Sequence, residues 1–206
     1  METYLKVILC WTIYFMVHSV FASDIMKRAF KRYFPSLNIY YRVIYNVFAT
    51  VGILAIFILQ STFHQMYMYK ADTSITLMGL GLASLGLIVI KESFGHYDLR
   101  EFLGLRQLSG NLAEQGFQRG GLLEYVRHPL YSGSMLLLIG YLIFVPGVLN
   151  LITVLCMITY FIIGSRYEEK KLIKTFGKKY LDYRKEVPAF IPSPGIMPGK
   201  FRKPKK

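Results

Sequence analysis

Cysteine, histidine and acidic residues are scarce in this chain. Of 206 residues, two are cysteine, four are histidine and 12 are aspartate or glutamate. Cys10 and Cys156 both fall inside apolar stretches, where a free cysteine is typically a small core residue. Their spacing fits neither a metal site nor a disulfide framework. We therefore expect no bound metal, and whatever chemistry the chain performs must rely on a few charged side chains.

An internal repeat and a nucleotide-binding loop are also missing. Transporters usually carry repeats and polar groups at the middle of the membrane, so the lack of a repeat argues against a small transporter. Gly79, Gly81 and Gly86 follow no strand and lie within an apolar stretch. They are not a dinucleotide-binding loop, because such a loop follows a strand. Small residues in a membrane helix instead let a neighbouring helix approach closely.

Long apolar runs, by contrast, are abundant. Hydrophobic residues make up 53% of the chain and occur in blocks of the length that spans a bilayer as a helix, about 17–25 residues. A signal peptide is the alternative for the first block, but Glu2 and a lone Lys6 replace the basic cluster that such a peptide needs. The sequence predicts an all-α, polytopic membrane protein with five transmembrane helices, at Tyr4–Ala22, Val43–Phe63, Thr73–Ile90, Pro129–Val145 and Val148–Gly164.

The net charge of +13 reflects topology rather than nucleic-acid binding. Of the 25 Lys and Arg residues, five follow the first block, five lie between the third and fourth blocks, and 13 follow Gly164. Only Lys6 and Lys70 remain. Because cytoplasmic loops of membrane proteins are enriched in Lys and Arg, we expect the N-terminus outside and the C-terminus and active site in the cytoplasm. Attraction to anionic lipid adds to this pattern.

The chain is expected to form one integral-membrane domain over residues 1–190, followed by a tail over 191–206. That tail is basic and rich in proline, which favours a disordered or membrane-associated segment. Pro146-Gly147 separates the last two apolar blocks and predicts a tight turn. The two blocks should therefore form an antiparallel hairpin. Such a hairpin returns the chain at once to the cytoplasmic side, where a cytoplasmic C-terminal helix follows.

Two clusters of polar residues flank this hairpin. The first is Arg127-His128-Pro129-Leu130-Tyr131, in which Pro129 suits the first turn of the next helix. Arg127 and His128 should therefore stand at a helix N-terminus with free N–H groups, a place that favours anions. In the second cluster, at 100° per residue, Glu169 falls on the same face as the apolar residues of the segment and Glu168 at its edge, although Gly177 interrupts the pattern. A carboxylate on a packed face needs a cationic partner, either a ligand or Arg127.

These two clusters resemble the signature of the isoprenylcysteine carboxyl methyltransferase family. The Arg-His-Pro-x-Tyr run and the later Glu-Glu-x-x-Leu, Phe-Gly-x-x-Tyr-x-x-Tyr and Val-Pro stretches occur in the order of that family, over about the C-terminal 40% of the chain. The resemblance implies an integral-membrane enzyme that uses S-adenosylmethionine. It implies that the donor is bound by Arg127, His128, Tyr131, Glu168 and Glu169.

A looser resemblance covers the N-terminal half. His18-Ser19-x-x-Ala-Ser and Tyr41-Arg-x-x-Tyr-Asn46 are similar to a bacterial branch of the family that includes membrane methanethiol S-methyltransferases. A polar residue inside a span usually faces the bundle interior, so His18 and Asn46 are candidate substrate-binding residues. One position departs from the family: Glu186 stands where an arginine commonly precedes Val-Pro. That arginine is thought to meet a substrate carboxylate, so Arg184 is a candidate to replace it.

Together these patterns predict a membrane methyltransferase that acts on a small or lipophilic acceptor, either a thiol or an isoprenylcysteine-type carboxylate. The bilayer is its expected surrounding, and no nucleic acid is expected. A thiol acceptor needs a base, because the thiolate is the nucleophile; His128 and His18 are candidates, and no catalytic residue is assigned. Two alternatives stay open: an NADPH-dependent membrane reductase on a similar helical scaffold, and a non-enzymatic transporter or scaffold.

Overall fold

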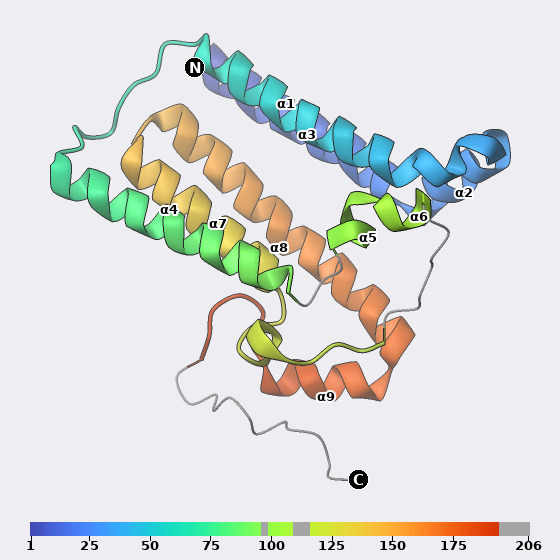
Figure 1. Cartoon of the computed structure of the whole chain (residues 1–206). Helices are drawn as coiled ribbons and strands as arrows, with labels where there is room; N and C mark the ends of the chain where they lie inside the picture. The colour runs from blue at the N-terminus through green and yellow to red at the C-terminus, as the bar shows by residue number, and fades with distance from the viewer. Residues whose placement is uncertain (96–98, 109–115, 194–206) are drawn as a thin grey trace. The chain divides into compact units, whose positions relative to one another are not determined.

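The computed structural model describes residues 1–95, 99–108 and 116–193, and helices account for all of its regular elements over these residues. The prediction of an all-α protein is therefore confirmed. The expected tail begins in the described part, but its residues 194–206 lie outside it. In chain order (Figure 1) the helices are α1 Glu2–Ala22, α2 Asp24–Tyr33, η1 Pro35–Tyr40, α3 Tyr41–Ser61, α4 Thr73–Ser93, α5 Leu99–Leu103, α6 Leu105–Leu108, η2 Gly121–Glu124, α7 Pro129–Phe144, α8 Val148–Phe176 and α9 Lys178–Glu186.

Within the described residues, four helices are long and apolar enough to cross a membrane: α1, α3 together with η1, α4 and α8. The remaining predicted span, Pro129–Val145, forms α7, which is apolar but only 16 residues long. Helix α8 continues 12 residues past the predicted end at Gly164, because the sequence there offers good helix formers and no proline or glycine. It stops before Gly177, whose φ of +56° is one that glycine adopts without strain.

The chain divides into two compact units, which are considered separately here. The first unit comprises Met1–Lys70, Asp98–Glu114 and Pro146–Met157. The second comprises Ala71–Tyr97, Gln115–Val145 and Ile158–Lys206. Helix α8 begins in the first unit and continues into the second. The expectation of one domain over residues 1–190 stays a prediction.

The first unit is built around Trp11 of α1, which is fully buried together with Leu149 of α8. A chain of polar side chains crosses this apolar core. The indole Nε1 of Trp11 donates to Thr153 Oγ1 over 3.0 Å, and Thr153 Oγ1 donates to Gln60 Oε1. The Gln60 amide then donates to Asn150 Oδ1 over 2.6 Å. Because buried polar groups are costly without partners, this chain fixes the register of α1, α3 and the start of α8.

In the second unit, α4 and α7 lie side by side over much of their length (Figure 1). Their contact is made through glycine. A Cβ added at Gly140 would stand 2.4 Å from the backbone nitrogen of Ala83, and one added at Gly86 would stand 2.5 Å from that of Leu137. The two backbones thus approach too closely for any side chain, which is the packing expected of small residues in membrane helices. Gly81, by contrast, has no atom within 4 Å of such a position.

Only three residues, 145–147, connect α7 to α8. In the first unit, Pro146 O accepts from Met68 N–H at 2.8 Å, and Val148 N–H donates to Met66 O at 2.9 Å. The segment before α4 therefore holds this turn in place. In the second unit, the ring of Tyr131 stacks on that of Phe161 with centroids 5.5 Å apart. The start of α7 accordingly lies against the later part of α8.

Candidate functional site

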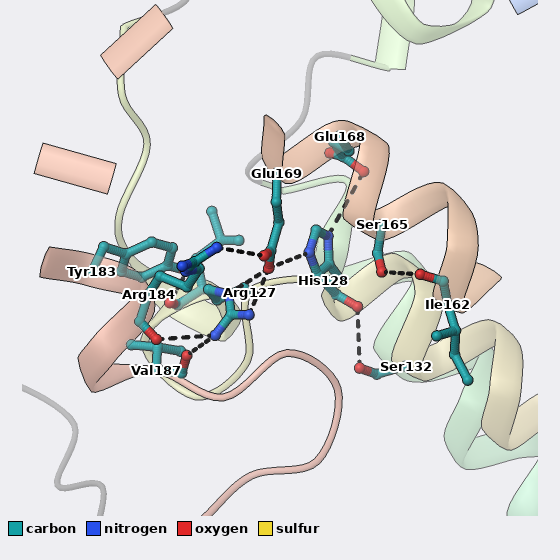
Figure 2. Close-up of polar contacts among 11 residues, drawn as sticks. Arg127, His128, Ser132, Ile162, Ser165, Glu168, Glu169, Tyr183, Arg184 and Val187 are labelled. Atoms are coloured by element: carbon teal, nitrogen blue, oxygen red, sulfur yellow. Dashed lines mark hydrogen bonds and ion pairs between the residues drawn. The ribbon is translucent and has the colours of Figure 1, made fainter. Parts of the chain in front are cut away.

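The N-terminus of α7 is formed as the sequence predicts. Pro129 occupies the first helical turn, and His128 is the residue immediately before it. Upstream, Gly121 adopts a φ of +55° at the start of the short helix η2, a conformation that favours glycine. This turn brings the chain to Arg127 and His128. Both side chains point into the cluster shown in Figure 2.

The backbone N–H groups at this helix start differ from the expectation. Arg127 N–H donates to Pro188 O at 2.9 Å, and His128 N–H donates to Ala189 O at 3.0 Å. The hydroxyl of Ser132 donates to Phe190 O at 2.7 Å. The expectation that Arg127 and His128 offer free N–H groups to an anion is therefore wrong. Buried backbone donors find partners wherever a chain segment can supply them, and here residues 188–190 supply them.

Glu169 is the centre of the cluster. Its Oε1 accepts from Arg127 Nε at 2.8 Å and from Arg127 Nη2 at 2.5 Å, and it lies 3.2 Å from His128 Nε2. The side chains of Arg127 and Glu169 are only 11% and 13% exposed. A guanidinium with two N–H groups on a carboxylate is a strong, charge-assisted contact. Arg127 therefore supplies the cation that a carboxylate on the packed face of α8 requires.

The remaining terminal nitrogen of Arg127 binds the chain elsewhere. Nη1 donates to the carbonyl oxygens of Val187, at 2.5 Å, and Arg184, at 3.2 Å. The guanidinium thus ties three segments together: the start of α7, the end of α8 and the C-terminal end of α9 (Figure 2). Because its nitrogens Nε, Nη1 and Nη2 all have protein acceptors, Arg127 acts first as a positioning residue for Glu169.

His128 is held between two carboxylates. It is 3% exposed, and while Nε2 faces Glu169, Nδ1 lies 3.7 Å from Glu168 Oε2. The ring also packs against Tyr131 and Phe190, with centroids 5.6 Å and 5.7 Å apart. The structure therefore brings together all five residues that the sequence predicted for the donor: Arg127, His128, Tyr131, Glu168 and Glu169. Glu168, whose side chain is 40% exposed, is the most accessible of the carboxylates.

Arg184 lies at the edge of the same cluster. Its Nη1 is 3.8 Å from Glu169 Oε2, and its side chain is 45% exposed. Glu186, which replaces the arginine common in the resembling family, forms an ion pair with Arg119. Arg119 also lies over the ring of Tyr183, with its guanidinium carbon 5.3 Å from the ring centroid. Sequence reasoning missed Arg119, because no motif connects it to a residue 67 positions later.

Sequence reasoning also missed Tyr180. It is the first tyrosine of the Phe-Gly-x-x-Tyr-x-x-Tyr stretch, to which no site role was assigned, and its ring packs in the buried group with Tyr183 and Val187. Its hydroxyl, however, is close to charge. The pKa of Tyr180 is raised to about 12, first by burial and then by the Glu169 carboxylate, while Arg127 acts in the opposite direction. Tyr180 is therefore part of the electrostatic surroundings of the cluster.

The two other predicted substrate residues belong to the first unit. The Nε2 atom of His18 in α1 lies 2.8 Å from the hydroxyl of Tyr45 in α3. The side-chain amide of Asn46 donates to Phe102 O at 2.8 Å and thereby contacts α5. His18 is thus hydrogen-bonded across two helices, whereas Asn46 is engaged with the backbone. Over the residues that can be described, no group of three or more His, Cys, Asp or Glu side chains is arranged to hold a metal.

The candidate membrane spans and the buried Arg–Glu–His cluster describe an integral membrane protein with a charged site at the start of α7. Residues 74–179, more than half of the chain, match the model of the family described as "Phospholipid methyltransferase". The chain belongs to the phospholipid methyltransferase family, and by family it is an enzyme that uses S-adenosylmethionine. No solved structure matches the chain.

The similar proteins are bacterial methanethiol S-methyltransferases. Methanethiol S-methyltransferase 2 of Bradyrhizobium diazoefficiens is 26% identical over 196 residues, which cover 93% of this chain and 74% of that protein. The protein of Mycobacterium tuberculosis is 27% identical over 190 residues, covering 86% and 73%. That of Crocosphaera subtropica is 32% identical over 119 residues, covering 54% of this chain and 45%, less than half, of that protein.

The side chains of the cluster suit the amino-acid end of S-adenosylmethionine. That end carries an ammonium and a carboxylate on one carbon, so its site needs groups of both signs. Glu168 and Arg184 supply accessible charges of opposite sign, and the ring of Tyr131 offers an apolar surface beside them. The Tyr180 hydroxyl is buried, with Arg127 near it as a donor and no acceptor for its hydrogen among the described residues. A buried hydroxyl without an acceptor is unusual in a folded protein and is consistent with a ligand that supplies one.

Proposed function

We propose that this chain transfers a methyl group from S-adenosylmethionine to a small or lipophilic acceptor, and that the acceptor is a thiol. The observation that carries the proposal is the Arg127–Glu169 pair. It joins the two polar motifs across α7 and α8 and leaves charges of both signs at the edge of the cluster. The names of the relatives, each a methanethiol S-methyltransferase, support a thiol as the acceptor.

In this proposal the donor is held mainly by carboxylates. Glu168 and the second oxygen of Glu169 bind the donor's ammonium or its ribose hydroxyls, because charge-assisted hydrogen bonds are the strongest polar contacts. Nε2 of His128 contacts Glu169, Nδ1 faces Glu168 at 3.7 Å, and Tyr131 lines the site. Arg127 contributes indirectly, by neutralising Glu169 and fixing its position. Arg184 is the accessible cation for the donor's carboxylate.

S-Adenosylmethionine supplies an electrophilic methyl group on a sulfonium that is its own leaving group. The protein's contribution is then chiefly to hold the reactants in line, since orientation alone provides much of the rate enhancement in such reactions. A set of clamped side chains suits this role. Arg127, His128 and Glu169 are hydrogen-bonded within the protein, so their directions are fixed before the donor arrives.

A thiol acceptor must lose its proton, because the thiolate is the nucleophile. His128 and His18 stay the two candidate bases. Nε2 of His128 lies 3.2 Å from Glu169 Oε1, and Nδ1 lies 3.7 Å from Glu168 Oε2. Nε2 of His18 lies 2.8 Å from the hydroxyl of Tyr45, a group that is able to relay a proton. Asn46 then serves the acceptor side by anchoring α5, since its amide binds the Phe102 carbonyl.

A carboxylate acceptor of the isoprenylcysteine type is disfavoured by the charges near Val187. Glu186 is an acid at the position where the resembling family has a base, and Arg119 is already paired with it. Arg184 is the remaining accessible cation of the cluster, but it lies within 3.8 Å of Glu169. The carboxylate of such an acceptor would therefore enter a region where Glu186 and Glu169 already compensate most of the positive charge of Arg119 and Arg184.

In this proposal the chain crosses the membrane five times, with α7 as the fifth span and the α7–α8 hairpin returning to the cytoplasm. The N-terminus is outside, and the cluster and α9 are cytoplasmic. Helix α2 supports this placement, because it follows the first span after a single residue and has no buried residue. At 100° per residue its four cations lie on one face, and Met26, Ala29, Phe30 and Tyr33 lie on the other. An amphipathic helix of this kind lies in the membrane surface.

Donor binding tests the proposal against its rivals. The purified protein in detergent is titrated calorimetrically with S-adenosylmethionine, with its demethylated product S-adenosylhomocysteine and with NADPH. We expect heat of binding with the first two and none with NADPH. Binding of NADPH alone would identify a reductase instead. A folded protein that binds none of the three at millimolar concentration would leave the transporter or scaffold alternative.

A further inference from the structure

The side chain of Tyr180 combines two features that its packing role does not explain. Its ring belongs to a buried group with Tyr183 and Val187, and the residue as a whole is 2% exposed. Its hydroxyl oxygen is buried, and none of the described residues offers its hydrogen an acceptor, since Arg127 can act on it only as a donor. Leaving a buried hydroxyl without an acceptor destabilises a folded protein. A phenylalanine would therefore pack equally well there without that cost.

The neighbouring Tyr183 shows what a satisfied tyrosine looks like in the same helix. It is buried to the same degree, at 3% exposed. Its hydroxyl donates to the carbonyl of Leu123 over 2.7 Å and so ties α9 to η2. The two tyrosines lie on the same helix with ring centroids 5.8 Å apart. They differ in that one hydroxyl has a structural acceptor and the other has none.

The surroundings of the Tyr180 hydroxyl are those of the donor cluster. Glu169, Arg127 and Glu168 are the charged groups that influence its ionisation, and burial keeps it protonated at physiological pH. A neutral hydroxyl in this place can donate to a carboxylate and accept from an ammonium. S-Adenosylmethionine carries both groups on one carbon at its amino-acid end.

We propose that the Tyr180 hydroxyl is a donor-binding group that hydrogen-bonds the amino-acid end of S-adenosylmethionine. This inference rests on the proposed function. It assigns a ligand contact to Tyr180, the first tyrosine of the Phe-Gly-x-x-Tyr-x-x-Tyr stretch, which is not among the residues expected from the sequence to bind the donor. It also accounts for a hydroxyl whose hydrogen has no acceptor in the described part of the protein.

The test compares two substitutions and two ligands. Tyr180→Phe and Tyr183→Phe each remove one hydroxyl from the full-length protein. The ligands are S-adenosylhomocysteine, which carries the amino-acid end, and 5′-methylthioadenosine, which lacks it. Affinities are measured calorimetrically, and the melting temperature is measured without ligand. We expect Tyr180→Phe to weaken S-adenosylhomocysteine binding about 10-fold, the usual effect of losing a hydrogen bond to a charged group. Its affinity for 5′-methylthioadenosine should be unchanged, and its melting temperature equal or higher.

Tyr183→Phe should give the reverse pattern, a lower melting temperature with unchanged affinity for S-adenosylhomocysteine. Three results would overturn the inference: an unchanged affinity of Tyr180→Phe for S-adenosylhomocysteine, an equal loss for both ligands, or a lowered melting temperature of Tyr180→Phe. The last would show that the hydroxyl has a structural partner. If the wild-type protein binds neither ligand, the proposed function itself fails, and that outcome is distinct from a defect confined to Tyr180→Phe.

Discussion

Arg127 and Glu169 lie 42 residues apart and form a two-pronged contact in which Nε and Nη2 of the guanidinium reach the same carboxylate oxygen. This contact gives the later part of α8 a fixed position against the start of α7. The contact also explains why Glu169, an acidic residue, occupies the packed face of an amphipathic segment. The protein itself supplies the cation for Oε1 of this carboxylate, and Oε2 is the oxygen that the proposed function assigns to the donor.

The Arg127–Glu169 pair should contribute strongly to stability. Removing one partner of a buried pair leaves an uncompensated charge and costs up to about 3–5 kcal/mol. We therefore expect Arg127→Gln and Glu169→Gln each to lower the melting temperature of the ligand-free protein. The double variant should lose less than the sum of the two, because it leaves no unpaired charge. Lys185→Gln is the control, since its exposed pair with Asp182 is expected to contribute little. Strict additivity would show that the two residues act independently.

The buried polar chain of the first unit should depend on Thr153. Its hydroxyl links the indole of Trp11 to the amide of Gln60. Thr153→Val keeps the shape of the side chain but leaves both neighbours unsatisfied, which should cost about 1–3 kcal/mol. Thr12→Val is a matched control, because that hydroxyl is exposed and donates only within its own helix, to Ile8 O. Thermal unfolding in detergent measures both. Equal melting temperatures would mean that the chain of hydrogen bonds has no net effect.

The close approach of α4 and α7 should tolerate no methyl group at Gly140. A Cβ there would lie 2.4 Å from the backbone nitrogen of Ala83, and a helix backbone cannot shift as a flexible side chain can. Gly140→Ala is expected to destabilise the protein by about 1–3 kcal/mol, the usual cost of overpacking. Gly81→Ala lies on the same pair of helices with open space around it, and it should be neutral or stabilise by about 0.5–1 kcal/mol by favouring the helix. Unfolding midpoints in detergent decide the matter, and a neutral Gly140→Ala would contradict the contact.

The membrane orientation is tested by labelling single cysteines in intact cells after Cys10 and Cys156 are replaced. Lys70→Cys should react with a membrane-impermeant maleimide, and Lys179→Cys should react only after the cells are opened. Lys70 is preferable to the nearby Asp72, whose carboxylate accepts from Ile75 N–H at the start of α4 and should be kept. Labelling of Lys179→Cys in intact cells would place the cluster on the outer side.

Sequence reasoning predicted the helical elements because their signals are local. Apolar blocks define the spans, Pro129 begins α7, and Gly177 ends α8. The gathering of Arg127, His128, Glu168 and Glu169 was also predictable, since the Pro146-Gly147 turn between two apolar blocks brings their far ends to one side. The sequence left two cations open for Glu169, a ligand or Arg127, and in the folded chain Arg127 binds it.

The contacts that escaped prediction connect residues with no common motif. Residues 188–190 satisfy the N–H groups of Arg127 and His128, and a pattern of side chains holds no information about backbone acceptors from a distant segment. Arg119 and Glu186 form an ion pair although they are 67 positions apart in the sequence, so no helical periodicity links them. Tyr180 was missed for a different reason. On an amphipathic segment an aromatic residue is expected to pack, and only the folded structure shows whether its hydroxyl has a hydrogen-bond acceptor.

The transfer of a labelled methyl group tests the central claim most directly. The purified protein in lipid nanodiscs is incubated with S-adenosylmethionine carrying a deuterated methyl group and with a small alkyl thiol, and volatile products are analysed by mass spectrometry. Glu168→Gln/Glu169→Gln, shown to be folded by its melting curve, serves as the comparison. We predict that the wild-type protein forms the thioether bearing the intact deuterated methyl group, and that the double variant forms far less. Absence of the labelled thioether from a wild-type protein that binds the donor would contradict thiol methylation.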